Sequence, residues 1–134
     1  MKLTLTAKEK IKTICEAFAS GNIAFILENF SEKFTWHDPS DPFIVPYGGI
    51  FKGKVGVSEF FHQLGTNTQM NLFEIEDFVA EDNKVVVTGR YGFRSTRTGE
   101  YAISEWIVIF HFENEEPLSA RMYYNTSDVE KVFS

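Results

Sequence analysis

The sequence has 134 residues, of which 43% are hydrophobic and 24% are charged, and these values are typical of one globular domain with a single core. The formal net charge is −6 and the Lys and Arg residues form no basic run, which argues against a nucleic-acid-binding face. We therefore predict a single domain over residues 1–134 without a nucleic-acid partner.

Cysteine usage and hydropathy indicate the compartment. The one cysteine, Cys15, cannot form an intrachain disulfide, which favours a reducing environment. Residues 1–5 contain no apolar run of signal-peptide length, and no segment is apolar enough to span a membrane. We expect a cytoplasmic protein without a membrane partner. Cys15 lies on an apolar helical stripe, so it is interpreted as a buried structural thiol rather than a nucleophile.

The aromatic content is high, with 14 Phe, 5 Tyr and 2 Trp. Such rings can fill a core, or they can line a pocket for a flat apolar ligand. Core packing accounts for most of them. The number of rings nevertheless leaves room for an aromatic-lined pocket.

Two helices are predicted at the start of the chain. Thr6 and Glu9 have capping-box spacing, so the first helix should begin after Thr6. Its apolar face is formed at helical spacing by Ile11, Ile14, Cys15 and Phe18. Ser20-Gly21 should end this helix, and Asn22 should cap a short second one. The short connection predicts that the two helices fold back on each other.

A strand that carries an acid follows at residues 34–38. Period two places Phe34, Trp36 and Asp38 on one side and Thr35 and His37 on the other. A carboxylate in such aromatic company is costly unless it is hydrogen-bonded, solvated or used. Asp38 is therefore the main candidate for function.

The strand should end at Pro39 and Pro42, and a glycine-containing segment should lead into a third helix. Turns are predicted at Gly48, Gly49 and Gly53. The third helix should end at Gly65, with an apolar face made of Val57, Phe60, Phe61 and Leu64.

The second half of the chain predicts four strands, at residues 72–80, 84–96, 101–113 and 118–126. Short turns separate them, so they should form an antiparallel meander. Asp128 could cap a last half-turn. We expect an α+β domain in which three N-terminal helices pack on a strongly curved, mostly antiparallel sheet and enclose a conical apolar pocket.

The longest predicted strand is apolar on both sides. Ile103, Ile107 and Ile109 alternate with Trp106, Val108 and Phe110. Since the helices cover only one face of the sheet, this pattern predicts that the outer face is also buried, most simply in a homodimer.

The order of these elements resembles a known family. A helix, the turn Ser20-Gly21-Asn22, a second helix, Phe34-Thr35-Trp36-His37-Asp38-Pro39 and then Tyr47-Gly48-Gly49-Ile50-Phe51-Lys52-Gly53 are similar to the SnoaL-like, ketosteroid-isomerase-like branch of the NTF2-like superfamily. The final strand, with Tyr123-Tyr124-Asn125, fits the same pattern. The resemblance covers essentially the whole chain and implies the cone-shaped fold. It also implies cofactor-free isomerases and cyclases, hydrolases or binding modules, often as dimers.

The resemblance to ketosteroid isomerases extends to one catalytic position. Asp38 matches their proton-shuttling aspartate, but the two donors that hold the enolate oxygen in those enzymes fall on Ile14 and near Val108, which cannot donate hydrogen bonds. The final-strand acid of epoxide-hydrolase relatives falls on Met122. The base of SnoaL-type cyclases lies on a late strand, where this chain has Trp106, Val108 or Phe110 facing in.

Two interpretations of Asp38 remain open: a general base with a pKa raised by the surrounding rings, or a turn residue satisfied by backbone N–H groups before Pro39. His37 is a weaker candidate, which could pair with Asp38 or face solvent. The candidate ligand-binding residues are Trp36, Tyr47, Phe61, Tyr101, Trp106, Val108, Met122 and Tyr124. No metal site is expected, because His62 and His111 have no partners at ligand spacing.

Three functional hypotheses follow. The first is a cofactor-independent isomerase, cyclase or lyase that acts on a small apolar carbonyl compound with Asp38 as base. The second is a non-catalytic module that binds a hydrophobic ligand in the same pocket. The third is a dimeric interaction domain whose pocket has no function of its own. Coupling of Asp38 to a proton donor across the cavity would favour the first hypothesis.

Overall fold

The computed structural model describes residues 6–134, so the N-terminal segment over which no signal peptide was predicted lies outside the described residues. The described part contains four helices and one six-stranded sheet. In chain order the elements are α1 (Ala7–Ala19), α2 (Ile23–Glu28), β1 (Thr35–Asp38), β2 (Gly49–Lys52), α3 (Gly53–Asn67), β3 (Thr68–Glu81), β4 (Lys84–Ser95), β5 (Tyr101–Glu113), β6 (Glu116–Tyr124) and α4 (Thr126–Lys131).

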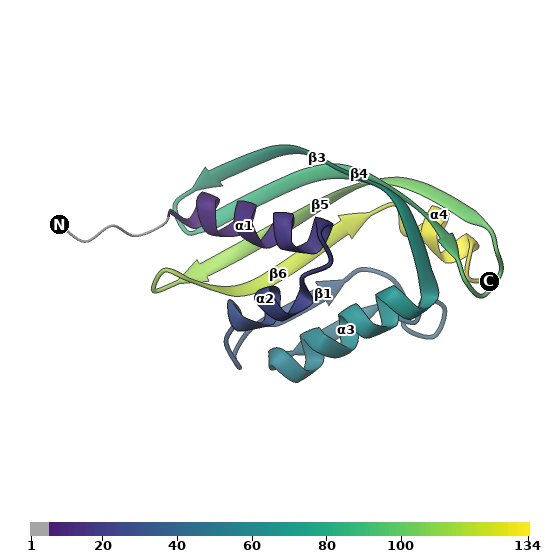
Figure 1. The fold of residues 1–134 in the computed structure, drawn as a ribbon, viewed down its shortest axis with the longest axis horizontal. Coiled ribbons are helices and arrows are strands. Elements are labelled where there is room, and N and C mark those ends of the chain that lie inside the picture. The colour runs from purple at the N-terminus through teal and green to yellow at the C-terminus, as the bar shows by residue number, and fades with distance from the viewer. Residues whose placement is uncertain (1–5) are drawn as a thin grey trace.

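The sheet is mixed, with the strand order β2-β1-β6-β5-β4-β3. Only β1 and β6 pair in parallel, and all other neighbouring strands are antiparallel. Figure 1 shows α1, α2 and α3 on one face of the curved sheet, with α4 at the end where the chain terminates. The predicted α+β class and the mostly antiparallel, curved sheet are confirmed.

The N-terminal helices begin where the sequence predicts. The Glu9 N–H donates to Thr6 Oγ1 at 3.1 Å, and the Thr6 hydroxyl in turn donates to Glu9 Oε1, so the cap closes through side chains. Asn22 caps α2 by accepting from the Phe25 N–H. The buried face of α1, which packs towards the sheet, is formed by Ile11, Ile14, Cys15 and Ala17.

The segment after β1 contains a strand that the sequence analysis missed. Glycine spacing predicted only turns here, but Gly49–Lys52 pairs antiparallel with β1, with Phe51 opposite Trp36. The strand is four residues long, too short to show a period. Its pairing makes β2 one edge of the sheet and holds Phe51 against Phe60 of α3.

The prediction that α3 ends at Gly65 is wrong. The helix continues to Asn67, and its last turn is held by a bond from Asn67 Nδ2 to the Gln63 carbonyl. Gly65 is exposed, with no atoms near the place where a side chain would stand. A glycine at such a position destabilises a helix by about 1 kcal/mol relative to alanine, which is too little to end it.

The four long strands confirm the predicted meander, with tight connections at residues of positive φ. Asp82 turns β3 into β4, while Asn114 and Glu115 turn β5 into β6. Register shifts between Met70 and Leu72, and between Ile75 and Asp77, interrupt the β3–β4 ladder. Such bulges bend a strand and increase its twist, which is consistent with the curvature seen in Figure 1.

The chain closes with α4 rather than a half-turn, and the predicted cap is corrected. Asn125 Oδ1 accepts from the Asp128 N–H, so Asn125 is the cap and Asp128 lies in the first turn. Beyond α4, Phe133 is buried and packs edge-on against Tyr47 with ring centroids 5.7 Å apart. The end of the chain therefore supports the loop between β1 and β2.

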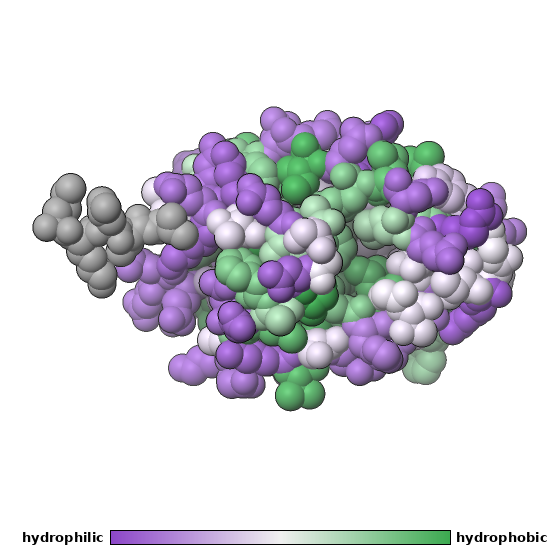
Figure 2. All heavy atoms as spheres, in the orientation of Figure 1, coloured by the Kyte–Doolittle hydropathy of each residue, from purple (hydrophilic) through white to green (hydrophobic). Residues whose placement is uncertain are grey.

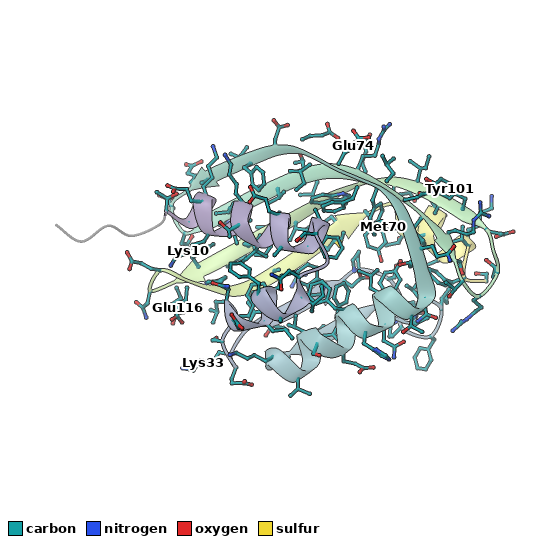
Figure 3. The ribbon with its side chains drawn as sticks, viewed as in Figure 1. Lys10, Lys33, Met70, Glu74, Tyr101 and Glu116 are labelled. Carbon is teal, nitrogen blue, oxygen red and sulfur yellow. The ribbon has the colours of Figure 1, made fainter. Side chains whose placement is uncertain are left out.

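The helix-covered face is polar at its rim and apolar towards its centre. Figure 2 shows hydrophobic side chains around a hollow in the middle of this face. Figure 3 shows Lys10, Lys33 and Glu116 projecting from the periphery. No helix in the range 6–134 is long and apolar enough to cross a membrane.

Candidate functional site

A cavity of about 80 Å³ lies between the inner face of the sheet and α1, α2 and α3. A single water needs roughly 10–15 Å³, so the cavity has room for a small organic molecule. Its walls are mainly aromatic and aliphatic, and they are formed by Ile14, Cys15, Phe18, Ile26, Phe30, Trp36, Asp38, Tyr47, Phe60, Phe61, Leu64, Met70, Phe73, Val87, Tyr91, Trp106, Val108, Phe110, Met122 and Tyr124.

Asp38 reaches the cavity because it is the last residue of β1. The two-residue period of the strand turns Trp36 and Asp38 inward, and the parallel partner β6 lies alongside. The Asp38 residue is 5% exposed. Among the lining residues Asp38 is the one that carries a carboxylate. The aromatic and aliphatic side chains around it solvate its negative charge poorly.

The two oxygens of Asp38 have different environments. Oδ1 accepts hydrogen bonds from the Tyr124 hydroxyl at 2.5 Å and from the Ser40 N–H at 3.1 Å. Oδ2 is buried and has no hydrogen-bond partner among residues 6–134. The Ser40 hydroxyl also lies 2.5 Å from the Tyr124 hydroxyl, so the three side chains form a short chain of hydrogen bonds. Oδ1 is thus used by the protein, whereas Oδ2 is left for another group.

Burial dominates the titration of Asp38. Loss of solvation raises its pKa to about 7, although the hydrogen bonds from Tyr124 and Ser40 favour the charged form and act in the opposite direction. A model aspartate has a pKa near ~3.9. Near neutral pH the group can therefore both accept and return a proton, which is the property required of a general acid–base residue.

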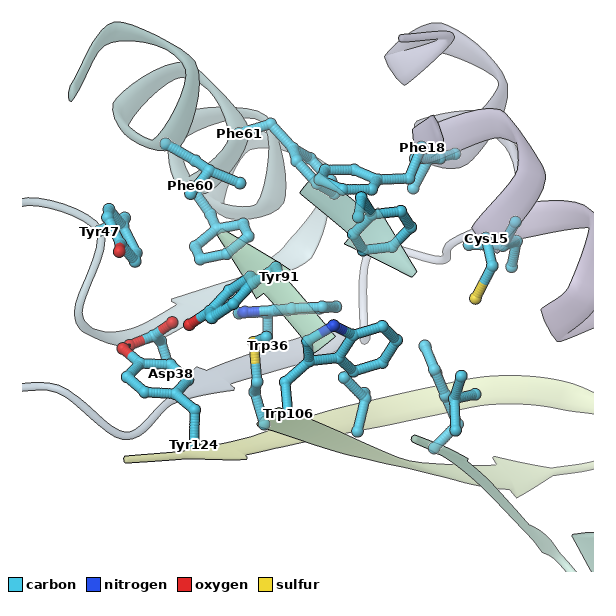
Figure 4. A pocket seen from close by; sticks show the side chains of 18 of the residues that line it. Cys15, Phe18, Trp36, Asp38, Tyr47, Phe60, Phe61, Tyr91, Trp106 and Tyr124 are labelled. Carbon is cyan, nitrogen blue, oxygen red and sulfur yellow. The ribbon is translucent and has the colours of Figure 1, made fainter. Parts of the chain in front are cut away.

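Two further hydroxyls lie close to this carboxylate. Tyr47 is 2% exposed and Tyr91 is 4% exposed, and neither hydroxyl has a hydrogen-bond partner within the described chain. Burial raises the pKa of both tyrosines, and the negative charge of Asp38 adds to the rise in each case. Both side chains therefore remain protonated donors. Figure 4 shows their hydroxyls on the same side of the cavity as Asp38 and Tyr124.

Tyr47 is positioned by a close backbone approach. Tyr47 is followed directly by Gly48, where an added Cβ would overlap the backbone of Ser40. The Ser40 N–H in turn binds Asp38. The glycine therefore lets two parts of the β1–β2 loop come together, so that Tyr47 and Asp38 face the same end of the cavity. We call this end, formed by Asp38, Tyr47, Tyr91 and Tyr124, the polar end.

The rest of the cavity is apolar and lined by stacked rings. Trp36 packs on Phe60 with centroids 4.9 Å apart, and Trp106 stacks nearly parallel to Phe73 at 5.5 Å. The indole N–H groups of both tryptophans are buried and have no hydrogen-bond partner in residues 6–134. In Figure 4, Cys15 and Phe18 lie at the side opposite the polar end. Burial and the nearby Glu16 raise the pKa of Cys15 to about 12, which keeps the thiol protonated.

Most of the sequence-predicted residues do lie together at the cavity. Besides Asp38, they are Trp36, Tyr47, Phe61, Trp106, Val108, Met122 and Tyr124. Ile14 and Val108, on or near which the resemblance places the donors of ketosteroid isomerases, also line the cavity and offer no side-chain hydrogen-bond donor. No three His, Cys, Asp or Glu side chains within the described ranges are grouped as metal ligands.

Two predicted site residues do not belong to the cavity. Tyr101, labelled in Figure 3, is the first residue of β5 and is 38% exposed. Its hydroxyl donates a hydrogen bond to Asn71 Oδ1 at 2.8 Å. Its odd-numbered position has the parity opposite to that of Trp106, so the alternation turns it outward. His37 is likewise turned away from Asp38 by the period of β1 and is absent from the cavity lining. Partial burial, Arg121 and Lys52 lower the pKa of His37.

Tyr91 and Ser40 belong to the site but are not among the residues predicted from the sequence. Tyr91 shares the parity of Val85 and Val87 on β4, so the two-residue period could have placed it in the cavity. Ser40 carries no such signal. Its hydroxyl meets Tyr124 across 84 positions of sequence, through a loop whose path depends on the complete fold.

The helices pack on a curved sheet and enclose an aromatic cavity with one buried carboxylate. This arrangement is that of a small α+β domain with an internal ligand-sized cavity. A family model described as the SnoaL-like domain matches residues 11–116. The chain belongs to this SnoaL-like family, which confirms the resemblance predicted from the sequence. Among curated proteins, none matches this chain.

Solved structures support the same fold. An NTF2-like protein from Burkholderia thailandensis has a TM-score of 0.88 at 15% identity, with 98% of this chain and 99% of that chain covered. TerC, co-crystallised with polyporic acid, has a TM-score of 0.82 at 19% identity, covering 95% and 97%. A protein from Pseudomonas putida described as a candidate polyketide cyclase has a TM-score of 0.76 at 16% identity, covering 98% and 100%. Likeness at these identities establishes the NTF2-like fold.

Proposed function

We propose that this protein binds a small, largely apolar carbonyl compound in the aromatic cavity and that Asp38 removes a proton from the carbon next to the carbonyl. The observation that carries the proposal is the state of the Asp38 carboxylate. Oδ1 is held by Tyr124 and Ser40, while Oδ2 is buried and free of protein partners within residues 6–134. A fixed carboxylate with one free oxygen is suited to take a proton from a bound ligand.

The proton transfer is balanced without a cofactor. The electron pair of the broken C–H bond moves into the ligand and places negative charge on the carbonyl oxygen, while the proton binds Asp38 Oδ2. Return of that proton to a different carbon completes an isomerisation. Attack of the same carbanion on a second carbonyl of the ligand closes a ring and leaves an alkoxide, and return of the proton from Asp38 to that alkoxide completes a cyclisation. With a pKa of about 7, Asp38 can accept the proton and release it again near neutral pH.

The comparisons are compatible with this proposal and supply its chemical direction. The relative from Pseudomonas putida is described as a candidate polyketide cyclase, and TerC was crystallised with polyporic acid. In this chain the cavity offers an organic ligand stacked rings for its apolar body and a carboxylate for reaction.

Exchange of α-protons tests the proposal directly. 1-Indanone, a flat enolisable ketone, is incubated with the protein in D₂O, and loss of the C2 proton signal is followed by NMR. We expect exchange faster than in buffer alone, and loss of this acceleration in Asp38→Asn. Asp41→Asn is the matched control, since Asp41 lies in the loop that follows Asp38, is exposed, and its carboxylate accepts only from the Phe43 N–H among the described residues. Acceleration that survives in Asp38→Asn would disprove the role of Asp38 as base.

A second candidate function is ligand binding without chemistry. It is favoured by Ile14 and Val108, which stand at or near the positions of the two oxyanion donors of ketosteroid isomerases and cannot donate a hydrogen bond. In this case 1-indanone would bind with an affinity that depends on the cavity, yet its α-protons would exchange at the buffer rate. The same NMR sample therefore separates the two functions.

A further inference from the structure

We infer that Tyr47 and Tyr91 form a pair of hydrogen-bond donors that holds the carbonyl oxygen of the ligand at the polar end of the cavity. This inference rests on the proposed function only in that the ligand carries a carbonyl group. It assigns the recognition of that group to two residues that the family resemblance does not mark. The relevant ligand class is a flat, apolar ketone with its oxygen at one end.

The first observation is the state of the two hydroxyls. The side chains of Tyr47 and Tyr91 are almost fully buried, and no protein atom among residues 6–134 accepts from or donates to their hydroxyls. Leaving a hydroxyl buried without a partner destabilises the folded protein, because the lost hydrogen bonds to water are not replaced. Apolar phenylalanine would avoid this cost at either position. Two such groups at one end of a cavity are therefore expected to meet a polar atom that enters it.

The second observation is the arrangement of these hydroxyls around Asp38. In Figure 4 both point towards the side of the cavity where the Asp38 carboxylate lies. The negative charge of Asp38 raises the pKa of both tyrosines beyond the effect of burial, and the charge of an ionised Tyr47 would raise the pKa of Tyr91. The three groups are therefore close enough to interact electrostatically. A carbonyl oxygen and the hydrogen on its neighbouring carbon are close enough within one ligand to meet two donors and Oδ2 together.

The third observation is that the Tyr124 hydroxyl is already hydrogen-bonded within the protein, whereas the hydroxyls of Tyr47 and Tyr91 are not. Tyr124 donates to Asp38 and contacts Ser40, so it is held as a support of the carboxylate. Tyr47 is fixed by rings instead, through edge contacts with Phe60 and Phe133. Tyr91 packs edge-on against Phe93, with centroids 5.7 Å apart. Ring contacts position both side chains while their hydroxyls stay free, which is the geometry of a preorganised donor.

This arrangement sets the orientation of the ligand. With the oxygen at the polar end, the apolar body extends between the stacked rings towards Phe18 and Cys15. The donors thus lie at the same end of the cavity as the base, and not at Ile14 and Val108. The protein thus has an alternative source of oxyanion stabilisation, and the missing family donors do not exclude proton abstraction.

Infrared spectroscopy tests the inference with 1-indanone labelled with ¹³C at the carbonyl. Donation from both tyrosines should lower the carbonyl stretching frequency of the bound ketone below its value in an apolar solvent. Tyr47→Phe and Tyr91→Phe should each raise the frequency, and the double variant should raise it further. Each substitution should also weaken 1-indanone binding by up to about tenfold. Binding of indane, the same ring system without the carbonyl, should be unchanged.

The controls separate this inference from the proposed function. Tyr123→Phe changes a tyrosine on the outer face and should leave both probes and the spectrum unaffected. Thermal unfolding of each variant shows that it remains folded. If the tyrosine variants alter neither the frequency nor the ratio of 1-indanone to indane affinity, the inference is overturned, even where Asp38-dependent exchange persists. If the frequency depends on the tyrosines while no exchange occurs, the inference stands and Asp38 is not a base. Failure of wild-type protein to bind either probe overturns both.

Discussion

The Tyr124 hydroxyl donates to Asp38 Oδ1 at 2.5 Å, linking the last residue of β6 to the last residue of β1. The two strands are parallel neighbours, so their C-terminal ends lie at the same end of the sheet. The Ser40 N–H binds the same oxygen, in the manner of an Asx turn before Pro39. Oδ1 therefore closes the turn, whereas Oδ2 is buried without a hydrogen-bond partner among residues 6–134, and the role of Asp38 as a general base stays a proposal.

Removing the Tyr124 hydroxyl should raise the pKa of Asp38. The hydrogen bond from Tyr124 stabilises the charged carboxylate and lowers the pKa against the larger effect of burial, so Tyr124→Phe leaves burial less opposed. We expect a value above about 7. Carboxyl-carbon NMR titration measures it, with Asp38→Asn to assign the signal. Tyr123→Phe is the control on the other face of the same strand, and an equal shift in both variants would contradict this explanation.

The raised pKa of Asp38 also predicts how stability depends on pH. In the unfolded chain Asp38 titrates near ~3.9, whereas in the folded protein burial raises its pKa to about 7. Between these values the folded state binds more protons than the unfolded state, so the free energy of unfolding falls as pH rises. The penalty is absent below about pH 4 and complete above about pH 7, where a shift of about three units corresponds to about 4 kcal/mol.

Asp38→Asn should therefore be more stable than the wild type at pH 8 and similar to it at pH 4. The amide stays neutral and keeps an oxygen that can accept from Tyr124 and Ser40. Urea unfolding from pH 4.5 to 8.5 measures the difference, which isolates Asp38 from the other titrating groups. Asp41→Asn should retain the wild-type slope. A pH-independent difference between Asp38→Asn and the wild type would show that Asp38 is not charged at a cost in the folded protein.

The sequence predicts the fold well because its strongest signals are local. The Thr6 cap, the Asn22 cap and the turn at Asp82 each act within a few residues, and all appear in the structure. The missed elements depend on distant partners. β2 forms because Phe51 pairs with Trp36, which lies on the other side of a loop. α3 continues beyond Gly65 to Asn67, and no neighbouring group ends the helix at Gly65.

The candidate site divides in the same way. The period of two places Trp36, Asp38 and Trp106 at the cavity, and it would also have excluded Tyr101 and included Tyr91 had it been applied to every tyrosine. The two-residue period of a strand does not predict that Oδ1 of Asp38 is hydrogen-bonded while Oδ2 has no partner in the described residues. That difference depends on where a loop and the end of β6 meet in three dimensions.

Gly89 should be required for the shape of the cavity. A Cβ at this position in β4 would overlap the carbonyl oxygen of Glu74 and the indole of Trp106. Gly89→Ala must therefore displace the β3 backbone or the Trp106 ring, and overpacking of this kind costs about 1–3 kcal/mol. Urea unfolding and tryptophan fluorescence measure the loss of stability and the altered ring environment.

Gly65→Ala provides the matched control for Gly89→Ala. It lies in α3 with no atoms within 4 Å of the added methyl group. Alanine is favoured over glycine in a helix by about 1 kcal/mol, so this variant should gain stability. Destabilisation of similar size in both variants would mean that the effect at Gly89 does not come from the contact with Trp106.

The outer face of the sheet carries an apolar patch that the helices leave uncovered. Ile103, Ile107 and Tyr123 are 52%, 41% and 45% exposed, and Ile107 pairs with Tyr123 across β5 and β6. Large side chains of this kind gathered on one face are typical of protein–protein contacts. We expect a second copy of the chain to cover the patch, as the two-sided apolar pattern of β5 predicts.

Sedimentation equilibrium tests this expectation. The wild-type protein should sediment as a dimer at micromolar concentration, and Ile107→Lys should shift it to a monomer, because a symmetric interface would bring two buried lysines together without partners. Val55→Lys is the control, since Val55 is exposed on α3, away from the sheet's outer face. A monomeric wild type, or a dimer unaffected by Ile107→Lys, would contradict the prediction. Because Ile107 points away from the cavity, the Ile107→Lys monomer should still bind 1-indanone if each cavity is complete within one chain.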